Sequence, residues 1–182
     1  LPAATTAADG PLILGLGVTT LAAELEDSDK LNEIWSGKEI PGPRILRRPS
    51  LRQTYDPGET VWSWRLAGAQ SVPVSPLGHR YQDTQMTSGP VVVGSAPNEL
   101  PPGTALHAEL RALVNAGLTP QQALQAAGIN AASELGLNLR LGRIATGAVA
   151  DLVLVDGDPL ADIGAALKIV GYDRPEVNPA GG

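Results

Sequence analysis

Histidine is the scarcest residue in this chain that could perform acid–base or metal chemistry. The sequence has 2 histidines, His79 and His107, and no cysteine. Two imidazoles and a carboxylate could bind a zinc ion, but nothing in the spacing of these two histidines brings them together. The absence of cysteine removes thiolate ligands, thiol nucleophiles and disulfides. A metal centre in this chain would therefore have few side chains to draw on.

Other polar residues that suggest chemistry are better explained by structure. His79 lies among prolines and glycines and is expected to be a loop residue. Ser95 lacks the second glycine of a nucleophile elbow and has no paired histidine. Asp151 precedes an apolar run, so a turn or a strand edge is its expected place. Asp156 and Asp158 flank a glycine in a sequence typical of a turn.

Composition excludes several classes of protein. The 182 residues include 13 Lys+Arg against 19 Asp+Glu, a net charge of -6, which argues against a nucleic-acid surface. The only basic cluster, 44–52, is interpreted as a solvated loop, with an anionic-ligand site as the alternative. No apolar run approaches the roughly 18 residues of a membrane span, and no signal-peptide pattern is visible. The compartment stays unknown.

The first half of the chain shows few clear elements. A turn or short helix over 12–17 is expected to run into a strand at 18–21. The acidic segment 27–29 can begin a helix that ends near Gly37. A strand is possible at 61–66, but the rest of 49–90 has no readable pattern.

The second half alternates strands and helices, which predicts an α/β fold. A buried strand is expected at 91–93, then a helix capped by Thr104 and stopped by Gly117. Thr119 begins a capping-box helix with a break near Gly128. Two strands are expected at 142–146 and 151–155.

The order of motifs in this half resembles the end of an amidohydrolase-superfamily enzyme of the imidazolonepropionase-like or dipeptidase-like kind. Such enzymes are metal-dependent hydrolases with a TIM-type barrel and a small β-sandwich. The resemblance covers roughly 91–170. The motifs that carry it are Leu100–Gly103, Leu106–Leu110, Ala116–Pro120, Asn130–Ala132, Leu141–Ile144, Ala150–Asp156 and Asp158–Leu160.

A second, shorter match lies near the N-terminus. Gly17–Thr20, together with Ser36-Gly37 and Ile40–Arg44, is similar to an early barrel strand and the helix that follows it. The resemblance therefore implies partial or truncated TIM-type barrel elements, because 182 residues fall below the roughly 200–250 of a closed barrel. Only about forty residues separate the two matching regions, so the chain is either an incomplete member or one that lacks internal segments.

The resemblance implies four regions. An early barrel-like strand and helix would occupy 1–48, followed by an unassigned, loop-rich segment over 49–90. The last barrel strand and its helices would occupy 91–140. The β-sandwich strands and the C-terminal tail would occupy 141–182.

The family's chemistry rests on bound divalent ions, such as zinc, that lower the pKa of a water molecule. A His-x-His pair, two further histidines and an aspartate normally supply or support that centre. Here Pro2-Ala3-Ala4 stands where His-x-His is expected, and Gly94-Ser95-Ala96 replaces the final Gly-Thr-Asp. We therefore expect no metal site in this chain, and the catalytic residues stay unassigned. His107 and Asn98 are the residues expected to bind substrate.

Two functions remain open at this stage. The resemblance implies a hydrolase of amide-type C–N bonds or related esters, acting on small molecules. The alternative is a non-catalytic α/β module that binds a partner or assembles with copies of itself, since an incomplete barrel leaves strand edges and apolar faces uncovered. A homo-oligomer is expected, without nucleic-acid or membrane partners.

Overall fold

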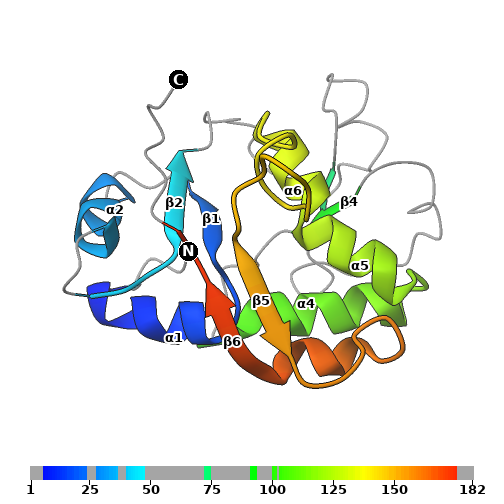
Figure 1. The fold of residues 1–182 in the computed structure, drawn as a ribbon. Coiled ribbons are helices and arrows are strands. Elements are labelled where there is room, and N and C mark those ends of the chain that lie inside the picture. The colour runs from blue at the N-terminus through cyan, green and yellow to red at the C-terminus, as the bar shows by residue number, and fades with distance from the viewer. Residues whose placement is uncertain are drawn as a thin grey trace, which may run out of the picture.

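The computed structural model describes residues 6–23, 28–36, 40–47, 72–74, 91–93, 100–101 and 103–175. Helices and strands are mixed along this part of the chain (Figure 1), in agreement with the α/β prediction. The strands form three two-stranded sheets, and no closed barrel forms among the described residues. The pairs are β1 (Thr20–Ala23) with β2 (Arg44–Arg47), β3 (Val72–Val74) with β4 (Val91–Val93), and β5 (Leu152–Val155) with β6 (Ile169–Asp173).

The N-terminal part packs two helices against the parallel pair β1–β2. A short 3-10 turn (Ala7–Asp9) leads into α1 (Gly10–Gly15), and α2 (Ser28–Ser36) forms where the acidic segment predicts a helix. Their apolar side chains share one buried cluster of five residues, Ile13, Val18, Leu31, Trp35 and Ile45. The indole Nε1 of Trp35 donates a hydrogen bond to the Ala7 carbonyl at 2.9 Å.

Gly42 gives the chain room to pass the Trp35 ring. A Cβ built on Gly42 would lie 2.3 Å from Cγ of Trp35 and 2.4 Å from its Cδ2. Real Cβ atoms do not approach an aromatic ring so closely, because cores are already close-packed. The Pro41–Pro43 turn therefore needs glycine here, and it delivers the chain to Arg44 at the start of β2.

The C-terminal helices form the second core. They are α4 (Thr104–Asn115), α5 (Pro120–Ala127) and α6 (Ile129–Glu134). The predicted capping box is confirmed: Thr119 Oγ1 accepts from the Gln122 amide at 3.2 Å, and the Thr119 amide donates to Gln122 Oε1 at 2.8 Å. The break at Gly128 is also confirmed. Val91, Leu110, Leu113, Ala123, Ala126 and Ile163 are the buried members of this core.

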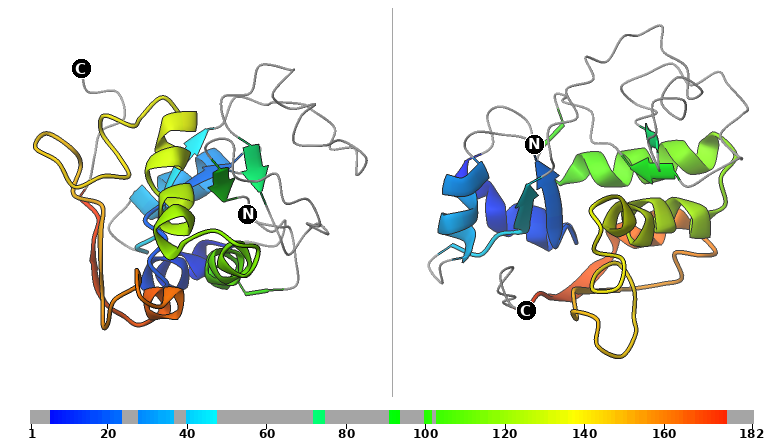
Figure 2. Two further views of the ribbon diagram at one scale, coloured as in Figure 1. Left: turned by 90° about the vertical axis from the view of Figure 1, so that its right-hand side faces the viewer. Right: turned by 90° about the horizontal axis from the view of Figure 1, so that it is seen from above.

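The antiparallel pair β5–β6 lies along one side of the helices, as the left view of Figure 2 shows. A 3-10 helix (Ile163–Leu167) connects the two strands on the outside of α4. The hairpin packs against Gly17, which follows α1 and has a φ of +78°; a Cβ there would lie 2.9 Å from Ile169 Cδ1 and 3.2 Å from Val153 Cγ1. Val153 and Ile169 therefore lie on the side of the hairpin that faces Gly17.

Several expectations about local structure are wrong. No strand forms at 142–146; the segment is a turn region in which Ile144 is 92% exposed. Thr104 is the first helical residue of α4, not its cap, because its Oγ1 donates to the Pro101 carbonyl and Gly103 occupies the N-cap position. β2 and β6 were not predicted as strands. The segment 61–66 lies outside the described residues.

Within the part of the chain that the structure describes, no helix has the length and apolar character needed to cross a membrane.

Candidate functional site

His107, the first predicted substrate-binding residue, lies at the joint between α4 and α1. Its Nε2 is 2.7 Å from the Leu16 carbonyl at the end of α1. A carbonyl oxygen only accepts, so Nε2 carries the proton and donates. A Cβ on Gly103 would meet Leu16 Cδ1 at 2.9 Å, which shows how closely the two helices approach. His107 therefore ties α4 to α1 through a backbone hydrogen bond.

The burial of His107 differs from the expectation. A residue that binds substrate is expected to be accessible, but His107 is only 6% exposed. Glu109, Leu110 and Leu113 of the same helix are also buried, Glu109 fully. Residues two apart lie on opposite sides of a helix, so α4 is buried on the side of His107 and also on the side of Glu109. Glu109 was not singled out from the sequence.

The second ring nitrogen, Nδ1, is buried and has no hydrogen-bond partner among the described residues. In the neutral ring with Nε2 protonated, Nδ1 is an acceptor. Burial lowers the pKa of His107 below 6.5; the bond to Leu16 opposes this shift, and the positive charge of Arg111 adds to it. The ring is therefore neutral at neutral pH and offers an unused lone pair.

The β4 strand, predicted as the last barrel strand, is held by α6. Asn130 Nδ2 donates to the Val91 carbonyl at 2.9 Å, and Val91 is buried in the C-terminal core. The parallel pairing of β4 with β3 agrees with the buried parallel strand expected at 91–93. The residues that follow β4, including Ser95 and Asn98, lie outside the described residues, and so does His79.

The described side chains do not fit a divalent metal centre. His107 Nδ1 could serve as one ligand, but among the described residues no group of three His, Cys, Asp or Glu side chains is placed to hold an ion. A zinc site needs three or four such ligands. We therefore derive no reaction step through a metal.

Arg44 is not the solvated loop residue that the basic cluster suggested. It begins β2 and forms an ion pair with Asp151 at 2.7 Å, with side-chain exposures of 9% and 7%. An anionic ligand is not needed to satisfy its charge, because an internal carboxylate does so. Asp151 lies directly before β5, at the strand edge where it was expected.

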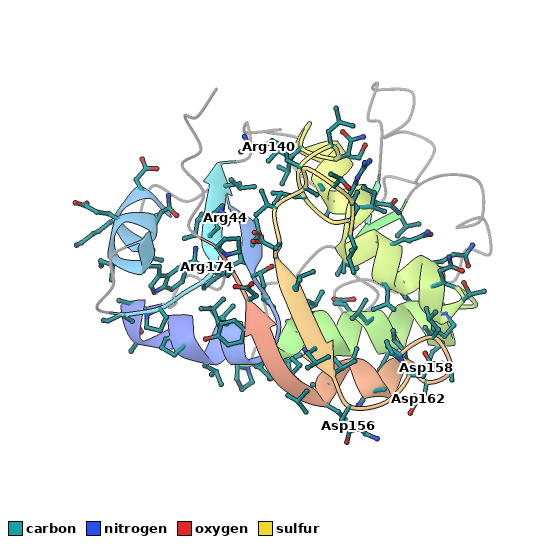
Figure 3. All side chains as sticks on the ribbon, viewed as in Figure 1. Arg44, Arg140, Asp156, Asp158, Asp162 and Arg174 are labelled. Carbon is teal, nitrogen blue, oxygen red and sulfur yellow. The ribbon has the colours of Figure 1, made fainter. Side chains whose placement is uncertain are left out.

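The acidic residues after β5 lie at the other end of that strand from Arg44 (Figure 3). Asp158 Oδ1 accepts from the Leu160 amide and Asp162 Oδ1 from the Gly164 amide, both at 2.8 Å. The Asp156 amide bonds the Lys168 carbonyl. The carboxylates of Asp158 and Asp162 stabilise turns in this way, which confirms the turn predicted over Asp156 and Asp158.

Comparison with known protein families gives a match over the part of the chain that contains β4, the helices α4 to α6 and the β5–β6 hairpin. Residues 91–179 match the Amidohydrolase family. This match, which covers just under half of the chain, supports the amidohydrolase-superfamily resemblance that the motifs indicated. A search of curated proteins found no match.

Three solved structures are similar over part of the chain. They are molinate hydrolase (26% identity, TM-score 0.44, covering 48% of this chain and 22% of that one), a Xaa-Pro dipeptidase with bound methionine (28%, 0.43, 46% and 20%) and an amidohydrolase (29%, 0.41, 48% and 22%). The matched part of this chain thus spans about a fifth of the length of each of them.

Proposed function

We propose that this chain is an amidohydrolase-like polypeptide, of a lineage that hydrolyses amide-type C–N bonds or related esters of small molecules, and that it binds such molecules without the metal centre that would cleave them. The observation that carries the proposal is the family match over 91–179. That range contains β4, the three helices α4, α5 and α6, and the hairpin β5–β6.

The proposed arrangement follows the regions expected from the sequence. Residues 91–140 supply the last barrel strand and its helices, and 141–182 supply strands of the β-sandwich. Residues 1–48 supply an early barrel strand and helix, and 49–90 stay unassigned apart from β3. The parallel pairing of β1–β2 and of β3–β4 supports barrel-type elements, and the antiparallel pairing of β5–β6 supports a sandwich.

His107 and Asn98 are the proposed substrate contacts. For His107 the contact would use Nδ1, because Nε2 is already bonded to Leu16; since Nδ1 is itself buried, a substrate would reach it only if a neighbouring segment moved aside. A neutral Nδ1 accepts hydrogen bonds, so it suits an amide N–H or a hydroxyl group of a substrate. Asn98 is proposed from the sequence resemblance alone.

The chain itself is proposed to lack the metal centre of the family. Amidohydrolases generally use a bound divalent ion, whose chemistry is to activate water. The chain has 2 histidines and no cysteine, and one of those histidines is committed through Nε2 to a backbone carbonyl. We propose that it retains the scaffold and a substrate contact without the ion.

The experiment screens small amides and esters for binding by ligand-observed NMR and for hydrolysis with and without added Zn²⁺. We expect saturable binding of some compounds and no hydrolysis. Absence of any binding would contradict a hydrolase-derived site, and Zn²⁺-dependent turnover would contradict the loss of the metal centre.

Two variants separate the roles of the two ring nitrogens. In His107→Gln the amide can still donate to Leu16 but no acceptor remains near Nδ1; in His107→Asn the short amide reaches the Nδ1 position and loses Leu16. A substrate contact predicts that binding is lost in the Gln variant while the melting temperature is retained. If the Gln variant binds like the unmodified protein, His107 is structural only.

A second candidate function is the self-assembling module, and the outer face of β5–β6 favours it. Leu154 is 65% exposed and Val170 63% exposed, next to Leu152 at 39%. Uncovered apolar strands of this kind are typical association sites. The occupant proposed under this alternative is a second copy of the chain.

Sedimentation of the Leu154→Lys variant tests the alternative. The matched control is Leu160→Lys, because Leu160 is also exposed (57%) but lies in the turn after β5. Assembly through β5–β6 predicts a dimer that only the first variant dissociates. A monomer in the unmodified protein would refute this function.

A further inference from the structure

One buried guanidinium contacts both ends of the β5–β6 hairpin. Arg44 Nη1 donates to Asp151 Oδ2 at 2.7 Å, and Nη2 donates to Asp151 Oδ1 at 3.3 Å. Nη2 also donates to the Pro175 carbonyl at 3.0 Å. Asp151 directly precedes β5, and Pro175 follows the end of β6 by two residues. The start and the end of the hairpin therefore meet at one side chain.

β1 completes this network. Arg44 Nη1 also donates to Thr20 Oγ1 at 3.0 Å, and that hydroxyl donates to Asp151 Oδ2 at 2.9 Å. We call Thr20, Arg44, Asp151 and Pro175 the Arg44 cluster. Its members come from β1, β2 and the two ends of the hairpin. Arg44 is 107 residues from Asp151 and 131 residues from Pro175 in the sequence, and Thr20 is 131 residues from Asp151.

A second arginine reinforces the same junction. Arg174 Nη2 donates to the Trp35 carbonyl at 3.4 Å, so the residue after β6 contacts the end of α2. Figure 3 shows Arg44 and Arg174 near each other, where β2 and β6 approach. Side chains from both parts therefore attach the hairpin to the N-terminal part: Arg44 contacts the ends of the hairpin, and Arg174 contacts the end of α2.

The hairpin itself is short and little buried. Its strands are four and five residues long, and an isolated two-stranded hairpin is marginally stable in water. Most of its side chains are half-exposed or exposed. An ion pair buried this deeply adds little net stability compared with apolar residues, but loss of one partner leaves a charge without a counterion. The effect of the Arg44–Asp151 ion pair is therefore to fix one position of the hairpin against β1 and β2.

We propose that the Arg44 cluster couples the β5–β6 hairpin to the N-terminal part, so that the hairpin stays folded only while Arg44 and Asp151 are paired. Arg44 is then the residue that makes two parts of the chain, distant in sequence, unfold as one cooperative unit. Arg44, which follows Pro41-Gly42-Pro43, thus couples the two parts of the chain, whereas the alternative from the sequence was that it binds an anionic ligand.

Hydrogen exchange of the full chain, read element by element, tests the proposal. In Arg44→Met we expect the amides of β5 and β6 to exchange on the order of a hundredfold faster, while the amides of α5 are unchanged. Thr20→Val is the matched control, since it removes the two hydrogen bonds of the Thr20 hydroxyl and leaves the ion pair. Its hairpin amides should exchange about tenfold faster, clearly less than in Arg44→Met.

Two outcomes overturn the proposal. Unchanged exchange in β5 and β6 would show that the hairpin is held without Arg44. An equal acceleration in α5 and in the hairpin would show a general loss of stability instead of coupling. If Arg44→Met does not fold, Arg44→Lys gives the same comparison, because it retains the charge but loses the two-nitrogen fork on Asp151.

Discussion

Replacing Gly42 with alanine is the most demanding test of the N-terminal packing. The added Cβ would lie 2.3, 2.4 and 2.7 Å from three atoms of the Trp35 ring, Cγ, Cδ2 and Cδ1. Ordinary carbon contacts are about 3.5–4.0 Å, so the ring or the turn must move by more than 1 Å. Trp35 is 1% exposed, so any movement of its ring displaces side chains packed around it.

The loss in free energy of unfolding expected for Gly42→Ala has two sources. Overpacking a close-packed core typically costs about 1–3 kcal/mol. Displacement of the ring also weakens the hydrogen bond from Trp35 Nε1 to the Ala7 carbonyl, which adds about 1 kcal/mol. A total of about 2–4 kcal/mol corresponds to a melting temperature lowered by about 5–15 °C in a chain of this size.

Thermal and urea unfolding, followed by circular dichroism and tryptophan fluorescence, would measure this loss. The matched control is Gly15→Ala, because a Cβ at Gly15 meets nothing within 4 Å. Alanine is the better helix former, so this control should be neutral or more stable by up to about 1 kcal/mol. Equal stability of the two variants, with unchanged fluorescence, would refute the packing described around Trp35.

Three further predictions concern the C-terminal half. Leu113→Ala should lower the free energy of unfolding by about 3–5 kcal/mol because the side chain is fully buried, whereas Leu139→Ala, at a 72% exposed position, should change it by less than about 0.5 kcal/mol in urea titrations. Asn130→Leu should cost about 1–3 kcal/mol, since the Val91 carbonyl loses its partner; no change in the urea midpoint would rule out this bond. Burial lowers the pKa of His107 in the folded state, so on acidification the unfolded chain binds the proton at a higher pH than the folded chain. The free energy of unfolding should therefore be constant above pH 6.5 and fall as the pH drops below 6.5. It should level off below the folded-state pKa. His107→Gln should flatten this part of the stability–pH curve, and an unaltered slope would contradict the burial of the ring.

Local chemistry was enough to predict much of the C-terminal half. The Thr119 capping box, the break at Gly128 and the apolar strand at 91–93 are each specified by neighbouring residues. Helix caps and turn glycines act over one or two turns of chain, so the sequence displays them directly.

The errors arose where distant parts of the chain decide the structure. Arg44 lies in a basic stretch; its pairing with β1 makes it a strand residue, and its contact with Asp151, 107 residues away, provides a counterion for its buried charge. The segment 142–146 has strand-like residues but no partner strand in the described structure, and Gly142, with φ +73°, packs its backbone against Gly128 instead. β6 forms because β5 is there to pair with it.

The candidate site was predictable only in outline. The resemblance selected His107, but its burial and its bond to Leu16 depend on α1, which lies 91 residues earlier. The lack of a hydrogen-bond partner for Nδ1 among the described residues is likewise a matter of tertiary packing. No local pattern in the sequence shows which ring nitrogen of His107 forms the hydrogen bond to a backbone carbonyl.

The central claim is that this chain has the scaffold of an amidohydrolase without its metal centre. Equilibrium dialysis of the purified chain against Zn²⁺, followed by elemental analysis after a wash with a weak chelator, tests that claim most directly. The claim predicts substoichiometric zinc that the wash removes. Zinc retained in stoichiometric amount, together with hydrolysis abolished by a strong chelator, would contradict it.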